Sequence, residues 1–305
     1  MIVCVCANPA IDSFVRIDDL SPGASHRALG EERFPGGKGV HVALAAAELG
    51  AQVTLVGIWA GPTGEWVRQQ CERSGVACRG PRVDGWTRTC LTFKSPGAYD
   101  DTELLGVGPE IGAPQAGAFL DEVIAAATAA TCVTISGSLP RGCPTTIYAD
   151  AVRGLRAGGA PTFLDCSGEP FSLALAAQPH AVHLNRSESA SFFGVDDPAG
   201  SARELARRCG FAVVTAGADG AYAAVGSDAA HASCRVETVH SAVGSGDCLT
   251  AGLAVAHDRG LDWRQGLRLG VACGSANCLR PELGMLHRAD VERLLTGVAS
   301  RDLPV

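Results

Sequence analysis

Short apolar runs rich in β-branched residues alternate along the chain with longer stretches rich in alanine and leucine. The short runs show no polar alternation, which is typical of strands covered on both faces. The longer stretches have the length and composition of helices, and Gly50 and Gly260 follow two of them as stop signals. The predicted strands are 2–7, 53–57, 132–137, 162–166, 181–185 and 213–217, and the predicted helices are 40–49, 118–130, 202–208, 249–259 and 265–278.

This rhythm predicts an α/β fold, a doubly wound and mostly parallel sheet with helices on both faces. Two polar, weakly alternating stretches interrupt it, at about 13–34 and 86–106. Paired with each other, they predict a small β-sheet lid over the carboxyl ends of the main strands, where open α/β sheets bind ligands. Because no long repeat or charged linker divides the chain, we expect one domain over 1–305 with the lid strands inserted in it.

Composition narrows the classes of partner and compartment. Hydrophobic residues make up 47% of the chain and aromatic residues 5%, which predicts a core of alanine, valine and leucine. The net charge of −7 argues against a nucleic-acid partner, because phosphate backbones need clustered lysine and arginine. The apolar runs fall far short of the roughly 20 residues of a membrane span, and Met1 leads directly into a predicted strand, so we expect a cytoplasmic protein without an export signal.

The thirteen cysteines lie mostly inside apolar runs. An odd, scattered set of this kind indicates small buried side chains in a reducing compartment rather than a disulfide framework. Cys4 and Cys6 share a strand face, but no second thiol or histidine pair with zinc spacing accompanies them, so we expect no metal cluster.

The most informative segment is 241–252, a glycine turn that leads directly into an apolar helix. In such a turn the backbone N–H groups of Gly244, Ser245 and Gly246 would converge with the helix dipole on a phosphoryl group and form an anion hole. Asp247 would then lie beside the phosphate, where it could accept the proton of an attacking hydroxyl. An aspartate that only caps the helix fits the same spacing.

Two commoner glycine motifs fit less well. Leu249 occupies the place of the third glycine of a dinucleotide fingerprint, and the segment 34–39 lacks the Lys-Ser/Thr ending of a phosphate loop.

Eight segments in order resemble the ribokinase-like (PfkB) carbohydrate kinases, most closely the branch of 1-phosphofructokinase and tagatose-6-phosphate kinase. The resemblance runs nearly end to end and implies ATP as co-substrate, Mg²⁺ as cofactor and, as in related kinases, a homodimer formed through the lid. The segments are 8–12, 36–39, 86–88, 135–140, 164–169, 185–188, 215–220 and 244–247.

On the acceptor side, the resemblance assigns substrate binding to Asp12, Gly37, Lys38, His41, Arg88 and Ser138. A carboxylate can accept two sugar hydroxyls, a glycine allows close backbone approach, and lysine and arginine can hold an existing phosphate. A turn-forming aspartate, solvated surface cations and an ordinary loop serine remain alternatives.

On the nucleotide side, the resemblance assigns His183, Asn185, Thr215, Gly217, Gly220, Gly246 and Asn277. Asn185 and Glu188 would face the magnesium–triphosphate through water, because Mg²⁺ keeps much of its hydration shell. Their spacing fits a helix-capping box equally well, and 215–220 could be a plain hairpin into 221–226.

Several positions depart from the family pattern. His41 and Cys90 stand where asparagine is usual, which leaves the sugar open. His183 and Leu184 replace Lys-Pro, which removes a fixed cation near the triphosphate. Ser245 in place of alanine is a mild change.

The expected reaction is in-line transfer of the γ-phosphoryl group of MgATP to a ketohexose phosphate: fructose 1-phosphate, fructose 6-phosphate or tagatose 6-phosphate. His41 and Cys90 motivate an alternative, a kinase for an unphosphorylated sugar or a nucleoside. His183 and Leu184 motivate another, a non-catalytic regulatory protein that binds a sugar or a nucleotide.

Overall fold

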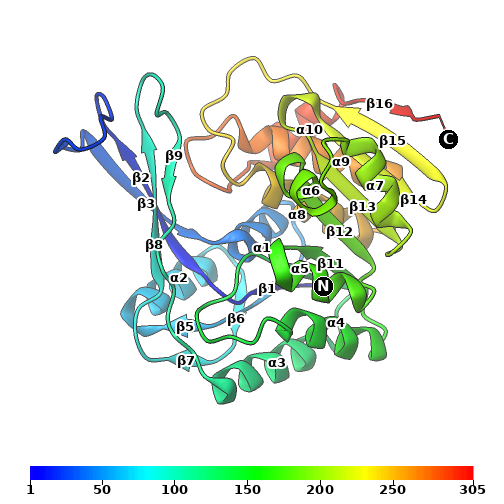
Figure 1. Ribbon diagram of the computed structural model, residues 1–305, viewed down its shortest axis with the longest axis horizontal. Coiled ribbons are helices and arrows are strands. Elements are labelled where there is room, and N and C mark those ends of the chain that lie inside the picture. The colour runs from blue at the N-terminus through cyan, green and yellow to red at the C-terminus, as the bar shows by residue number, and fades with distance from the viewer. Residues whose placement is uncertain (305) are drawn as a thin grey trace.

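A ten-stranded sheet forms the centre of the computed structural model, which describes residues 1–304 (Figure 1). Its order is β16-β15-β14-β13-β12-β11-β10-β1-β4-β6. All pairings from β6 to β13 are parallel, and β14, β15 and β16 extend the sheet in antiparallel fashion. The strands are β1 (Ile2–Cys6), β4 (Val53–Gly57), β6 (Ala77–Arg79), β10 (Cys132–Ser136), β11 (Thr162–Asp165), β12 (Ala181–Asn185), β13 (Phe211–Thr215), β14 (Ala221–Val225), β15 (Asp228–Ser233) and β16 (Ala299–Asp302).

Helices cover both faces of this sheet. Successive residues of β1 point to opposite faces, so that Cys4 packs with one buried cluster and Val5 with the other. On the first face lie α1 (Lys38–Glu48), α2 (Gly61–Arg73), α8 (Ser245–Asp258), α9 (Trp263–Asn277) and α10 (Arg288–Leu295). On the second lie α3 (Ala113–Ala127), α4 (Ile147–Ala157), α5 (Gly168–Ala176), α6 (Arg186–Phe193) and α7 (Pro198–Ala206). The predicted fold class is confirmed.

A separate four-stranded sheet projects from one end of the molecule (Figure 1). It consists of β2 (Ala10–Arg16), β3 (Gly30–Gly36), β8 (Arg88–Lys94) and β9 (Thr102–Leu104), in the order β3-β2-β8-β9. The two excursions do pair, because β2 runs parallel to β8. We call this sheet the lid. Its first strand begins at Ala10 rather than near 13. The prediction began late because the apolar residues at 10 and 11 resemble a continuation of the preceding strand, β1.

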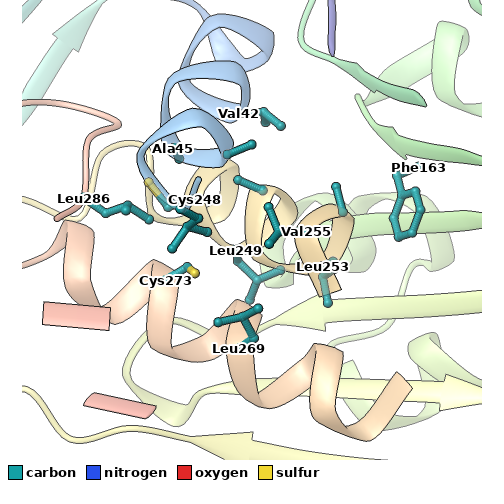
Figure 2. Close-up of a cluster of buried hydrophobic side chains, with 14 of the residues drawn as sticks. Val42, Ala45, Phe163, Cys248, Leu249, Leu253, Val255, Leu269, Cys273 and Leu286 are labelled. Carbon is teal, nitrogen blue, oxygen red and sulfur yellow. The ribbon is translucent and has the colours of Figure 1, made fainter. Parts of the chain in front are cut away.

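The first-face core is built from small side chains. Gly252 of α8 faces Gly270 of α9, where an added Cβ would lie 2.8 Å from the Gly270 Cα, so the two helices approach closely. Figure 2 shows aliphatic and thiol side chains of α8 and α9 interleaved beside α1. Those labelled are Val42, Ala45, Phe163, Cys248, Leu249, Leu253, Val255, Leu269, Cys273 and Leu286. This packing fixes the position of the first turn of α8.

Element boundaries differ from the prediction where glycine and polar residues enter a helix. The helix expected from 249 begins at Ser245. The prediction placed its start late because the first turn contains glycine and aspartate rather than apolar residues. The strand expected at 213–217 is Phe211–Thr215, and Gly217–Asp219 form a short 3-10 turn, η1. The short pair β5 (Trp59–Ala60) and β7 (Arg82–Val83) was not predicted, nor were α2, α4, α5, α10, β6, β15 and β16. The helix α6 and the strand β14 correspond to the capping-box and hairpin alternatives.

All thirteen cysteines are free thiols, and eight of them are buried. Within residues 1–304 no group of histidine, cysteine and carboxylate side chains is arranged to hold a metal ion by itself. Over the same residues, none of the helices has both the length and the apolar character needed to cross a membrane.

Candidate active site

The first turn of α8 presents backbone donors at the carboxyl end of the central strands. Gly244 precedes the helix with φ 84°, and a Cβ there would overlap the backbone of Gly284. The N–H of Ser245 already donates to the Ala242 carbonyl at 3.1 Å. Within the described chain, the N–H groups of Gly246 and Asp247 have no such carbonyl partner. Among the described residues the Gly244 N–H has no such partner either. The donors available to an anion are therefore those of Gly244, Gly246 and Asp247, and Ser245 of the predicted triplet is already engaged.

Asn277 supports this turn from α9. Its side-chain Nδ2 donates to the Val243 carbonyl at 3.0 Å and to Ser245 Oγ at 3.2 Å, and the residue is 1% exposed. Its observed contacts are thus with the turn, and its predicted contact with a nucleotide stays a prediction.

Asp247 is buried at the third position of α8 and does not act as the helix cap, since Gly244 occupies that position. Its Oδ2 accepts a hydrogen bond from His41 Nδ1 at 2.7 Å. Burial raises the pKa of Asp247, and His41 and Lys38 offset that rise in part. A carboxylate with a raised pKa beside two backbone donors has the proton affinity that a general base needs.

His41 lies between two carboxylates from different parts of the fold. Its Nε2 is 2.9 Å from Oδ2 of Asp12, an ion-pair distance, although the angle departs from hydrogen-bond geometry. Burial alone would lower the pKa of His41, but its contacts with Asp12 and Asp247 raise it to about 10. The structure thereby joins the lid residue Asp12, the α1 residue His41 and the α8 residue Asp247, all three of them predicted site residues.

Lys38 takes part in a second charged cluster around Asp165, the last residue of β11. Lys38 Nζ is 2.9 Å from Asp165 Oδ1 and 3.5 Å from Glu188 Oε1. Asp165 Oδ2 also accepts from Thr250 Oγ1 and lies 3.2 Å from His183 Nδ1. Burial alone would raise the pKa of Asp165, but Lys38 and His183 hold it well below its usual range.

Asp165 belongs to this charged cluster, although the sequence prediction gave it no role. A carboxylate directly after a buried apolar strand was the available signal, because parallel strands deliver such residues to one edge of a sheet.

Asn185 and Glu188 form the capping box of α6. Asn185 Oδ1 accepts from the Glu188 N–H at 2.9 Å, and Glu188 Oε2 accepts from the Asn185 N–H at 2.9 Å. The capping interpretation therefore describes their mutual contacts. Oε1 of Glu188 remains directed toward Lys38, so the residue also belongs to the charged cluster.

A family model described as pfkB family carbohydrate kinase matches residues 5–286. The chain belongs to this family. It is 34% identical over 267 residues to a 1-phosphofructokinase of Xanthomonas campestris, covering 83% of each chain, and 27% identical over 290 residues to a 1-phosphofructokinase of Bacillus subtilis, covering 93% of this chain and 94% of the relative. The molecule is thus an ATP-dependent sugar kinase of the 1-phosphofructokinase branch.

A solved structure agrees in fold. Phosphofructokinase-2 from Escherichia coli, in complex with substrates and products, superposes with a TM-score of 0.89 at 23% identity, and the match covers 97% of this chain and 98% of that one. At this level of identity the likeness concerns the ribokinase-like fold alone.

In this kinase His183 packs beneath the first turn of α8. A Cβ at Gly246 would lie 3.0 Å from the His183 ring, and His183 Nε2 is 3.2 Å from Thr215 Oγ1. Gly217, with φ 58°, and Gly220, with φ 90°, shape the connection from β13 into the antiparallel strand β14. The hairpin interpretation thus describes the backbone, and nucleotide binding by these residues stays a prediction.

Arg88 is the first residue of β8, and its hydrogen bond is not with the Lys38 cluster. Its Nη2 donates to the Asn8 carbonyl at 3.2 Å, while its Nε is buried without a partner. Asn8 Nδ2 donates to Ser138 Oγ at 3.3 Å. Arg88 and Ser138 therefore meet through Asn8, a residue of the first resemblance segment to which no role was given. Gly37, with φ 93°, precedes α1 and packs against the Asn8 carbonyl.

Proposed function

We propose that this kinase transfers the γ-phosphoryl group of ATP to a hydroxyl of a ketohexose phosphate, with Asp247 as the general base. The observation that carries the proposal is the position of Asp247, buried at the third residue of α8 beside the unpartnered N–H groups of the same turn. Two relatives named 1-phosphofructokinase support a phosphorylated ketose as the acceptor.

The chemical step follows from this arrangement. The acceptor hydroxyl transfers its proton to Asp247 as its oxygen attacks the γ-phosphorus, and the bond from phosphorus to the leaving oxygen of ADP breaks. The Gly246 and Asp247 N–H groups, together with the helix dipole, stabilise the charge on the transferring group. Asp12, whose second oxygen is free of His41, holds the sugar hydroxyls in line.

Arg88 is the side chain best placed to receive a phosphate that the acceptor already carries. Its buried Nε lacks a partner, and a guanidinium binds phosphate through two parallel hydrogen bonds. Lys38 is held by Asp165 and Glu188 instead, so we assign its charge to the triphosphate side. There it compensates for the lysine that His183 replaces in the family pattern.

The residues around Glu188 fit a magnesium ion. The carboxylate of Glu188 is 18% exposed and offers the hard oxygen that Mg²⁺ prefers, and Asn185 Oδ1, committed to the helix cap, would contact the ion through water. When bound, Mg²⁺ neutralises charge on the triphosphate oxygens.

One observation favours a second candidate, a kinase for an unphosphorylated sugar or a nucleoside. Both carboxylate contacts hold Lys38 away from an acceptor phosphate. Of the two predicted phosphate-binding cations, this leaves Arg88, whose Nε has no hydrogen-bond partner among the described residues. If Arg88 serves only to hold Asn8, the acceptor needs no phosphate.

The test measures ADP release with MgATP against fructose 1-phosphate, fructose 6-phosphate, tagatose 6-phosphate, their unphosphorylated sugars and several nucleosides, with Asp247→Asn as blank. We expect one preferred ketose phosphate. Arg88→Ala should raise KM for it at least about tenfold, as loss of a charge-assisted contact implies, whereas the exposed Arg153→Ala should not. Turnover of unphosphorylated acceptors alone would select the second candidate. Silence across the panel with intact ATP binding would select a regulatory protein.

We also propose that two copies of this kinase pair through their lids. Large apolar side chains of the lid and its flanks are exposed, namely Leu29 at 67%, Trp86 at 65%, Leu104 at 59%, Leu105 at 63% and Val107 at 67%. Such a concentration supports an interaction surface. The free thiols support a reducing, cytoplasmic location.

A further inference from the structure

We propose that His41 is a positioning residue: a doubly protonated imidazole that clamps Asp12 of the lid to Asp247 of α8 and keeps the base ionised and aimed. The inference rests on the proposed function of Asp247 and adds a role for the position at which this chain departs from its family. An asparagine at this position could form hydrogen bonds, but it could not supply a positive charge.

The contacts determine the protonation state of the ring. Nδ1 is 2.7 Å from Asp247 Oδ2, and Nε2 is 2.9 Å from Asp12 Oδ2. An unprotonated ring nitrogen would direct its lone pair at an ionised carboxylate, which repels it, so a proton on each nitrogen is favoured. Nδ1 then donates to Asp247, and Nε2 forms an ion pair with Asp12 at an angle outside hydrogen-bond geometry. With both nitrogens protonated, His41 is an imidazolium, and it brings its charge between two buried acids.

The surroundings are shaped to hold this ring. His41 is 4% exposed, and a Cβ at Gly284 would overlap its Cγ. A Cβ at Gly36 would likewise overlap the Asp12 carboxylate. Glycine at both positions leaves the space that the ring and its lid partner occupy. The clamp is therefore built from α1, α8, the lid and the loop that contains Gly284.

Most of the charged groups around His41 are acidic, so a positive charge on its ring has a large effect on them. The groups that face this cluster are Asp12 from β2, Glu103 from β9, Asp165 from β11, Asp247 from α8 and Lys38 from α1. Lys38 is already 2.9 Å from Asp165. His41 is thus the cation in direct contact with Asp12 and Asp247. Without it, burial would favour protonation of Asp247, and the nearby charge of Asp165 would add to that effect.

Two consequences follow for the reaction. The imidazolium lowers the proton affinity of Asp247, so that more of the base is ionised at neutral pH than burial alone would allow. It also ties the Asp12 carboxylate of the lid to α8, so binding of sugar hydroxyls at Asp12 and the aim of Asp247 depend on the same ring.

The first experiment compares the pH dependence of kcat/KM for the wild-type kinase and His41→Asn, which restores the residue usual in the family. We expect the acid limb to move upward by about 1–3 pH units, the range produced by loss of an adjacent opposite charge. Far below the limb, kcat/KM should therefore fall about tenfold or more, with a smaller loss on the alkaline plateau. The matched control, His287→Asn, replaces a surface histidine at a helix N-cap and should leave the profile unchanged.

A second readout needs no activity. In the sugar-free wild-type protein, proton NMR should show low-field imidazole N–H resonances that persist well above pH 6.5, the ordinary midpoint for histidine. They should be absent in His41→Asn, shifted in Asp247→Asn and retained in His287→Asn. An unmoved acid limb in His41→Asn, or a ring that titrates with the ordinary midpoint, overturns the proposal. If the wild-type protein phosphorylates no acceptor, the proposed function fails, but the NMR result still decides the state of the clamp.

Discussion

At the scale of single residues, the site depends on how burial and neighbouring charges set proton affinities. Asp165 and Asp247 are both buried acids, yet their pKa values move in opposite directions. Lys38 and His183 hold Asp165 ionised, whereas burial dominates at Asp247. One acid is therefore a fixed negative charge, and the other can take up a proton during the reaction.

This difference predicts the pH dependence of the wild-type enzyme. The base must be ionised to accept a proton, so activity is present above the pKa of Asp247 and is lost as the pH falls through it. Because that pKa is raised, the acid limb of kcat/KM should lie above the value of about 3.9 of an ordinary aspartate. Initial rates from about pH 4 upward, with circular dichroism to monitor folding, measure it. A profile that stays flat until the protein unfolds would contradict the assignment.

The sequence identified Asp12, His41 and Asp247 one by one, but not their contact. The three residues are far apart in the chain, and only the packing of the lid and α8 around α1 brings them together. Lys38 shows the same limit, because its partners Asp165 and Glu188 are set by where β11 and α6 end.

At the scale of elements, the turn before α8 carries the anion-binding donors. Gly244 has φ 84° and no room for a Cβ against Gly284. Gly244→Ala should therefore displace the turn and lower kcat about 10²–10³-fold, the effect of losing an oxyanion donor. Gly260→Ala is a matched control at the other end of α8, since Gly260 also has positive φ, 69°, but open space around it.

Steady-state kinetics of the two variants make the comparison. Both should lose stability because of backbone strain, but only Gly244→Ala should lose kcat at a temperature where both are folded. Equal kcat in the two variants would show that the turn does not serve catalysis.

Elements of mainly apolar sequence could be predicted, whereas helices that mix polar and apolar residues, such as α2 and α4, were missed. The strands at 53–57 and 181–185 match their observed bounds, because a mainly apolar run, interrupted within the strand only by Thr54 or by His183, marks a strand covered on both faces. The start of α8 was placed four residues late, since Ser245, Gly246 and Asp247 lack apolar side chains. Their helical conformation is stabilised by the tertiary packing of α8 on α9.

At the scale of the whole molecule, the lid and its flanks carry several large apolar side chains that a monomer leaves exposed. Leu105, which directly follows β9 of the lid, is 63% exposed. Val195, which follows α6, is similarly exposed at 55% and lies outside the lid. If lids pair, Leu105→Glu should convert the dimer to a monomer in size-exclusion chromatography with light scattering, whereas Val195→Glu should not. A wild-type protein that is monomeric at micromolar concentration would exclude lid pairing.

The fold brings the proposed base, its clamp and the charged cluster to one edge of the sheet from strands and helices spread over the chain. The central claim is that Asp247 is the general base. Its most direct test is the single-turnover rate of Asp247→Asn with saturating MgATP and the preferred acceptor, alongside ATP affinity by calorimetry. We predict a rate at least about 10²-fold lower with ATP affinity nearly unchanged; undiminished turnover in Asp247→Asn would contradict the account.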